Sequence, residues 1–594
     1  MRLVSHLVYR LAVVSLLVVA SNAQAPAAAP NSSAGPPDSQ SATQQEIPTF
    51  KASTRLVSVE VVARDHKGQA VPGLTAGDFQ VFEQIGPKRD QRPQKISAFR
   101  ATSVHEIAAQ DAGEPQMAPG VYTNLITMNR VPVPPTILLV DGLNTDRVSQ
   151  MQVHQQMLRM LASIPDNVPI AVFLLGRRLR MVQNFTTDPK LLKSALEKAR
   201  SAEHDDSTEI DPRDDPDAMS AMLEDNPTAR GAGPLLDTVR RFEQETYSFQ
   251  LDIRVQETLD ALEGIARYVA GYPGRKNLLW ISSSFPIMFL PDPDTQLPMR
   301  FYGKDVAGVA SALADAKVAV YPVDPGGLQV SSVFTAGSRV RRNVAGTLSR
   351  EATSRFDRQE SMQSLAEQTG GIICVSDNDL GDCVKKAMDD SSFFYEIAYY
   401  PNSGDWKGEF HRIIVKSTRP GIHLAYRQGY YARGREEETD PKSAAEELQR
   451  AACQDVLTST SVLMVAKAFP EPGKLKYFVA IEPSTITFTP QTDGTQHVAL
   501  RVALCSFDKT GKPLRFIQDT IDQRLTDKQF AQTQAQHGFT SVVSILPTPE
   551  VAVVRVLIKD VATGRMGSVN IPNVETAAAA TAPAAPAPGI PLPH

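Results

Sequence analysis

The sequence predicts an α/β fold with a doubly wound, mainly parallel sheet at its centre, flanked by an N-terminal and a C-terminal β-rich module. Two observations predict the centre. Apolar runs at residues 136–140 and 170–175 are continuous, which is typical of strands covered on both faces. Segments with the period of amphipathic helices alternate with such runs, and this order favours parallel pairing. A third observation predicts the flanks, where apolar and polar residues alternate as in half-buried strands.

The length of 594 residues is too great for one hydrophobic core and corresponds to roughly three or four domains. The formal net charge of −5 argues against a nucleic-acid-binding protein, because such proteins carry a basic face. The predicted units are a signal peptide at 1–23, a disordered Pro/Ala/Ser linker at 24–48, a small β module at 50–105, the α/β domain at 130–400, a β extension at 401–435, a charged helical linker at 436–450, a β-sandwich-like module at 451–573 and a disordered Ala/Pro tail at 574–594.

The N-terminus has the pattern of a secretory signal peptide. Arg2 and Arg10 supply positive charge, and residues 11–20 form an apolar run that is short for a membrane span. Small residues follow, and we expect cleavage after Ala23. The mature chain would then be secreted or periplasmic and would contain no transmembrane segment. The alternative is an uncleaved membrane anchor.

The N-terminal module begins at residue 56, where valines alternate with other residues up to residue 61. Thr75 and Asp78 form a capping-box pattern just before a second strand at 79–83. Further apolar positions close the module near residue 105.

The central region contains the continuous apolar runs and the helical segments between them. The buried strands are predicted at 136–140, 170–175, 277–281 and 318–323, an edge strand at 179–182, and helices from 188, near 255–269, around 306–313 and at 362–368. Residues of about 203–230 interrupt this order with acidic residues and prolines. We interpret them as a surface insertion.

Beyond residue 393 the sequence again favours strands. Three aromatic strand-like segments are followed by a charged stretch with a short helix near 433–450. Several further strands, separated by turn residues such as those at 509–511, predict a β sandwich.

The four cysteines are an even number, which fits disulfides in an oxidising compartment. Three pairings are open. We favour Cys374–Cys383 and Cys453–Cys505, because each pair stays within one predicted unit. Free buried thiols are the alternative, and the spacing fits no zinc motif.

Polar side chains follow two of the predicted strands where those strands end. Asp141, Asn144 and Thr145 follow the first strand, and Ser282 and Ser283 follow another. Ligands of open α/β sheets bind beyond the carboxyl ends of strands, and oxygen ligands suit Mg²⁺. The alternative is that Asp141 caps a helix while its neighbours shape the loop.

These segments resemble the von Willebrand factor A-related family of the acidobacterial type. The segments that carry the resemblance are residues 56–59, 73–79, 139–145, 273–280 (Pro-Gly-Arg-Lys-Asn-Leu-Leu-Trp) and 429–431 (Gly-Tyr-Tyr), in this order. The resemblance implies a von Willebrand factor A-like centre with a metal-ion-dependent adhesion site, whose pattern is Asp-x-Ser-x-Ser after the first strand.

The match to that adhesion site is partial. Asp141 fits the first position and Thr145 replaces the last Ser, but Leu143 stands where the first Ser belongs. Ser282 or Ser283 occupies the strand end at which such domains carry a second Asp. We therefore expect a degenerate site at which Mg²⁺ binding is weak or lost, and we predict no other cofactor.

A second candidate surface follows the strand at 318–323. Arg339, Arg341 and Arg342 begin a run of arginines that would meet an acidic partner or a phosphate. The alternative is a solvated helix face, on which Glu351 and Asp357 offset the charge.

Signatures of enzymes are poor in this sequence. His105-Glu106 lacks the second His of a zinc-protease helix, and residues 282–284 lack the glycines of a nucleophile elbow. We predict an exported, non-enzymatic protein of the binding or adhesion type, whose partner is a protein or a cell-envelope component. A structural envelope protein and a secreted hydrolase that uses the serines are the alternatives.

Overall fold

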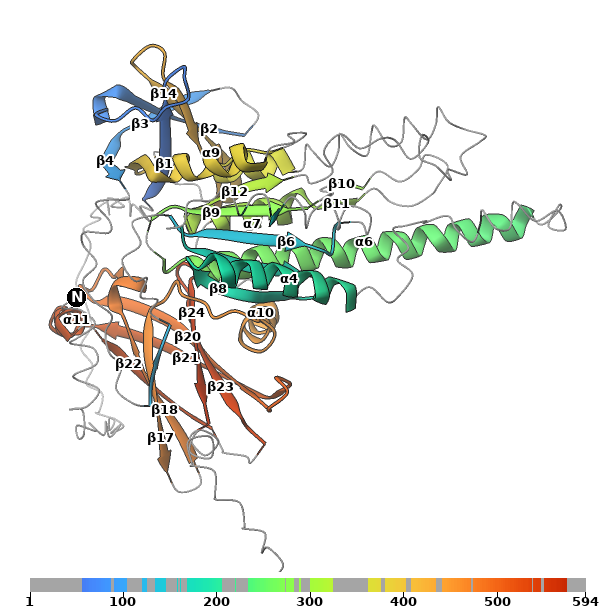
Figure 1. Cartoon of the computed structure of the whole chain (residues 1–594). Coiled ribbons are helices and arrows are strands. Elements are labelled where there is room, and N and C mark those ends of the chain that lie inside the picture. Colours follow the sequence, from blue (N-terminus) through green and yellow to red (C-terminus); the bar gives the residue numbers. More distant parts are fainter. Residues whose placement is uncertain are drawn as a thin grey trace, which may run out of the picture.

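The computed structural model describes most of the chain between residues 56 and 573. The described residues are 56–86, 90–103, 120–124, 134–145, 157–158, 161, 168–205, 220, 233–272, 274–282, 288–289, 300–323, 362–374, 380–401, 407–433, 441–471, 474–536, 538–545 and 550–573. The predicted signal peptide, linker and tail lie outside these residues, as does most of the predicted acidic insertion. The described part forms three packed units, namely two β sandwiches and one mixed sheet between helices (Figure 1).

The mixed sheet forms the middle unit. Its order is β12 (Val318–Val323), β9 (Lys276–Ile281), β6 (Thr136–Asp141), β7 (Ile170–Leu175) and β8 (Leu179–Thr186). The first four strands are parallel to one another, and β8 is antiparallel at the edge. Every residue of the four parallel strands is buried. This explains why their sequences are continuous apolar runs.

Helices cover both faces of this sheet. One face packs against α6 (Gly233–Val269) and α7 (Gly303–Asp315), and the other packs against α4 (Pro189–Asp205) and α9 (Leu380–Ser392). Asp188 accepts a hydrogen bond from the backbone N–H of Lys190 at 2.8 Å and so caps the start of α4. The short hairpin β10 (Met288–Phe289) and β11 (Arg300–Phe301) lies beside this unit.

The predicted doubly wound, mainly parallel fold of von Willebrand factor A type is wrong for this chain. Most of its sheets are antiparallel, and among the described residues parallel pairs occur in one mixed sheet. The buried parallel strands dominate the sequence signal because they are continuously apolar. The antiparallel strands alternate apolar and polar residues, and many pair with strands far away in the sequence, which periodicity alone does not reveal.

The first sandwich is built from two distant parts of the chain. One sheet has the order β15 (His423–Tyr426), β1 (Val57–Arg64), β13 (Phe393–Tyr399), β4 (Ile96–Ser103), and the other has the order β16 (Gly429–Arg433), β14 (Lys407–Ser417), β2 (Phe79–Ile85), β3 (Gln91–Gln94). The alternating valines of β1 face the apolar side chains of the second sheet. The predicted β module at 50–105 and β extension at 401–435 therefore form one unit in the structure.

The second sandwich contains the C-terminal strands and one strand from the N-terminal half. Its sheets are β22 (Phe539–Ile545), β18 (Lys474–Ile481), β17 (Met464–Glu471), β5 (Val121–Thr123), and β19 (Thr489–Pro490), β20 (Gln496–Phe507), β23 (Val553–Asp560), β24 (Met566–Pro572), with β21 (Pro513–Leu525) beside β20. The amide of Asn124 donates to the carbonyls of Ser459 and Val462 at 2.8 Å. The chain therefore visits this sandwich before it enters the mixed sheet.

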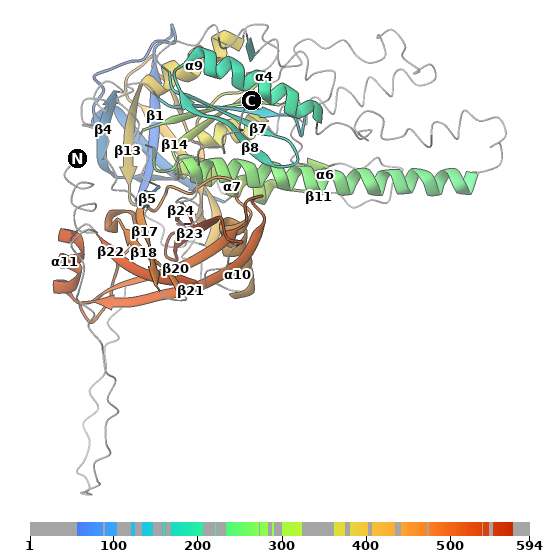
Figure 2. The ribbon, with the colours of Figure 1, turned by 60° about the horizontal axis from the view of Figure 1, so that its bottom comes forward.

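Helix α6 joins the mixed sheet to the second sandwich and also leaves the body of the protein. Its 37 residues correspond to a length of about 55 Å, and Figures 1 and 2 show its N-terminal half projecting beyond the sheet. At the other end, the hydroxyl of Thr460 donates to the Tyr268 carbonyl at 2.7 Å and accepts from the Gly271 N–H at 2.8 Å. A Cβ atom on Gly271 would lie 2.6 Å from the Thr460 carbonyl oxygen, so this contact requires glycine.

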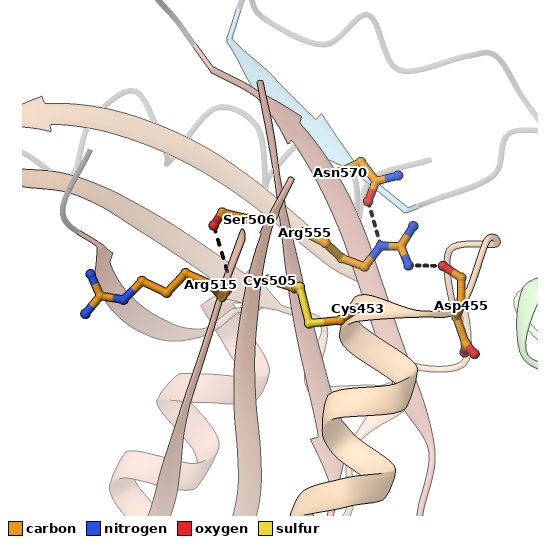
Figure 3. Close-up of a disulfide and its surroundings, with 7 residues drawn as sticks. All are labelled: Cys453, Asp455, Cys505, Ser506, Arg515, Arg555 and Asn570. Carbon is orange, nitrogen blue, oxygen red and sulfur yellow. Dashed lines mark hydrogen bonds between the residues drawn. A yellow bond between two sulfur atoms is a disulfide. The ribbon is translucent and has the colours of Figure 1, made fainter. Parts of the chain in front are cut away.

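A disulfide fastens α10 (Pro441–Cys453) to β20 (Figure 3). It joins Cys453 and Cys505, which confirms that predicted pair. Arg555 on β23 donates to Asn570 at 2.8 Å and also to the carbonyl of Asp455, two residues after the bridge. Cys374 is also disulfide-bonded, whereas the side chain of its predicted partner Cys383 lies outside the described residues.

Replacing Cys453 and Cys505 by Ala should lower the free energy of unfolding by about 2–4 kcal/mol. The bridge closes a loop of 52 residues, and its removal restores freedom to the unfolded chain. Urea unfolding without reductant measures the change. An unchanged midpoint would show that packing of α10 alone holds this corner together.

Candidate functional site

Asp141 ends β6, the central strand of the mixed sheet, and its buried carboxylate is the acceptor for three neighbouring side chains. Oδ2 accepts hydrogen bonds from the Asn144 amide at 2.9 Å, the Trp280 indole at 3.0 Å and the Ser282 hydroxyl at 2.8 Å. Oδ1 accepts from the Asn144 backbone N–H at 2.9 Å. The structure therefore brings Asp141, Asn144 and Ser282 together at the carboxyl end of adjacent strands.

Asn144 extends this network to helix α6. Its amide also donates to the Thr258 hydroxyl at 2.8 Å, and Thr258 donates to the Arg254 carbonyl one turn earlier at 2.8 Å. Thr145 is buried beside Asn144. The loop after β6 is thus fixed from the sheet and from the helix together.

Leu143 has a structural role in this loop. Its backbone N–H donates to the Leu175 carbonyl at 3.0 Å, and its side chain packs against the core under α6. A serine at this position would lose that apolar contact. The departure from the adhesion-site pattern therefore coincides with a packing function.

The electrostatics of Asp141 are those of a buried carboxyl. Burial raises its pKa above the usual range, and hydrogen bonds from Asn144, Ser282 and Trp280 oppose that rise. A carboxylate offers about four lone-pair sites, and protein donors already direct four hydrogen bonds to this one. A cation at this corner would have to displace donors that are buried with it.

Other predicted site residues are not brought into this corner by the described structure. Ser283, Arg339, Arg341 and Arg342 lie outside the described residues. Within those residues, no group of three or more His, Cys, Asp or Glu side chains is arranged to hold a metal ion. The Ser282 hydroxyl is buried and donates to Asp141, so it is not presented to a substrate.

A cavity of about 760 Å³ lies where the three units meet. Its walls come from β1, α6, α7, α10 and the turn at 561–566. Many of its charges pair with one another or with neighbours. Lys317 lies 2.6 Å from Glu396, and Arg267 lies 2.8 Å from Asp455. The cavity is therefore bordered by the ion pairs that hold the units together.

Two buried basic residues begin β9 beside this cavity. Arg275 donates to the Gly370 carbonyl at 2.6 Å, and Lys276 donates to the Tyr272 carbonyl at 2.9 Å. Burial lowers the pKa of the Lys276 ammonium to about 7 from its ordinary value of 10.5. Both residues belong to the segment at 273–280 that carries the family resemblance.

A second surface feature lies on the projecting part of α6. Leu235, Phe242, Phe249 and Ile253 are 55%, 61%, 64% and 42% exposed. Their spacing of seven, seven and four residues places them on one face of the helix. We call these four residues the α6 stripe. The repeat is visible in the sequence, but only the structure shows that nothing in the described chain covers it.

Comparisons with known proteins give weak likenesses. No protein-family model matches the chain, and neither does any curated protein sequence. Among solved structures, an aerotolerance-related membrane protein from Bacteroides fragilis is similar over 43% of this chain and 98% of its own, with 11% identity and a TM-score of 0.22.

Two further structures give similar values. BatB, a conserved hypothetical protein from Bacteroides thetaiotaomicron, is 12% identical over 43% of this chain and 96% of its own, with a TM-score of 0.21. A variant of the PilB minor pilin from Streptococcus sanguinis is 8% identical over 43% and 60% of the two chains, with a TM-score of 0.22. At these TM-scores the likeness carries no argument about function.

Replacing Asp141 by Ala should lower the free energy of unfolding by roughly 2–4 kcal/mol, because Trp280, Ser282 and Asn144 would lose their shared buried acceptor. Asp493→Ala, which removes an exposed turn carboxylate, is the control and should cost less. Calorimetry with Mg²⁺ or Mn²⁺ should show no tight binding to either protein. Tight binding that Asp141→Ala abolishes would identify a working cation site.

Replacing Lys276 by Met should flatten the pH dependence of stability. The unfolded chain binds more protons than the folded chain between about pH 7 and pH 10, so the free energy of unfolding of the wild type should rise with pH in this window. Met removes the amine that titrates. Urea unfolding at several pH values measures the slopes, with the exposed Lys193→Met as the control. Equal slopes in wild type and Lys276→Met would contradict the assignment.

Proposed function

We propose that this chain is an exported, non-enzymatic binding protein that attaches to a protein or a component of the cell envelope. The observation that carries the proposal is the α6 stripe, because four large apolar side chains aligned on one projecting helix form a contiguous apolar surface. Isolated exposed apolar residues are ordinary, but aligned ones mark sites of interaction.

The residues with chemical potential support binding over catalysis. Asp141 and Ser282 are buried and bonded to each other, whereas a catalytic nucleophile or base must be within reach of its substrate. In this proposal the Asp141 corner is a degenerate adhesion site that now stabilises the loop after β6. A hydrolase that uses the serine at this strand end would need the corner to open.

The disulfide chemistry supports export. Cys453 and Cys505 are joined, and Cys374 is also disulfide-bonded; such bonds persist in oxidising compartments. Among the described residues, no helix is both long and apolar enough to cross a membrane. The signal peptide predicted at 1–23 remains a proposal, because it lies outside these residues. The net charge of −5 agrees with a partner other than nucleic acid.

The proposal is tested by cross-linking capture from an envelope extract of the source cells, with the mature chain as bait. Wild type should retain a partner that the double variant Phe242→Ser, Phe249→Ser loses, because these substitutions remove the most exposed apolar side chains. The control is Leu191→Ser, which removes an exposed apolar side chain from α4 instead. Retention of the same proteins by all three baits would refute binding through α6.

A further inference from the structure

The charges nearest to the α6 stripe are acidic. At about 100° per residue, Glu245, Asp252 and Glu263 lie roughly 60–80° from the middle of the stripe on one side, and Asp260 continues the stripe toward the body of the protein. Glu245 is exposed, and the Glu263 side chain is 44% exposed. Arg240 and Arg241 lie at least ~100° from the stripe by the same arithmetic. The apolar surface therefore has an acidic border.

The acidic border ends at the cavity between the three units. Asp260 and Glu263 line that cavity on α6, and Asp305 and Asp315 line it on α7. The Asp315 side chain is 63% exposed. Arg267, the basic residue of α6 at this end, is already paired with Glu263 at 2.9 Å and with Asp455 at 2.8 Å. Acidic side chains thus continue from the stripe onto the neighbouring helix.

Three occupants of an apolar helix face can be compared by charge. A second copy of this chain, laid stripe to stripe, would bring two acidic borders together, which is unfavourable. An anionic lipid surface would repel the same residues, and membrane-surface helices carry Lys and Arg on their polar face. A partner helix with apolar residues at heptad spacing and Lys or Arg beside them would match both the stripe and its border.

We infer that the α6 stripe binds a basic amphipathic helix of a partner protein. This inference rests on the proposed binding function and specifies its chemistry. The two phenylalanines alone expose on the order of 250 Å² of apolar surface, and the stripe spans 18 residues or about 27 Å, which is five turns of a partner helix. The acidic border fixes which helices are accepted, because like charge on the partner would be repelled.

The test uses the full mature chain and a labelled 18-residue peptide of Leu and Lys in heptad order. Fluorescence anisotropy at low salt should show binding that weakens as salt screens the acidic border. Phe242→Ser with Phe249→Ser should weaken binding at least about tenfold, and Glu245→Lys should weaken it several-fold. Leu191→Ser should leave it unchanged. A peptide with Glu in place of Lys should not bind.

Several results would overturn the inference. Equal binding of the Lys and Glu peptides would show an apolar surface without charge selection. Sedimentation that reveals dimers dissolved by Phe249→Ser would make a second copy the occupant, and stripe-dependent binding to phosphatidylglycerol vesicles would make it a lipid surface. If the peptide fails while the envelope capture still depends on Phe242 and Phe249, the partner chemistry is wrong but the binding function stands. If both fail, the proposed function falls as well.

Discussion

The burial of one half of α6 governs the arrangement of this protein. Apolar residues from Leu251 to Val269 cover one face of the mixed sheet, and excluding them from water is the main driving force for this packing. The end of the same helix accepts the second sandwich through Thr460 and Arg267. Since the C-terminal half is held so firmly, the N-terminal half can project from the body without losing its helical form (Figure 2).

The corner at Asp141 shows how a site with the residues of an ion-binding loop becomes structural. The buried charge is costly unless it is satisfied, and here four protein donors supply the hydrogen bonds that water or a cation would otherwise provide. The same bonds connect β6, β9 and α6. Polar chemistry in this position therefore contributes to the rigidity of the unit from which the α6 stripe extends.

The two sandwiches solve a different problem, which is how to enclose apolar faces that no local segment can cover. Strand β1 alternates apolar and polar residues and finds its neighbour in β13, across the whole mixed-sheet unit. Strand β5 likewise joins β17 of the second sandwich. These distant pairings tie the ends of the chain to its middle, and the disulfide between Cys453 and Cys505 then fixes α10 on the second sandwich (Figure 3).

The sequence by itself determined the local elements whose signals are local. Continuous apolar runs identify the strands at 170–175 and 318–323, and the Thr75–Asp78 pattern identifies a capping box that the structure contains. Tertiary structure alone decided which strands pair, because the register between distant segments depends on the joint burial of their faces and leaves no periodic mark. It also decided that Thr258 completes the Asp141 network and that the apolar repeat from Leu235 to Ile253 faces solvent. A heptad repeat is the same in a core helix and in an exposed one, and only the packing of the remaining chain distinguishes them.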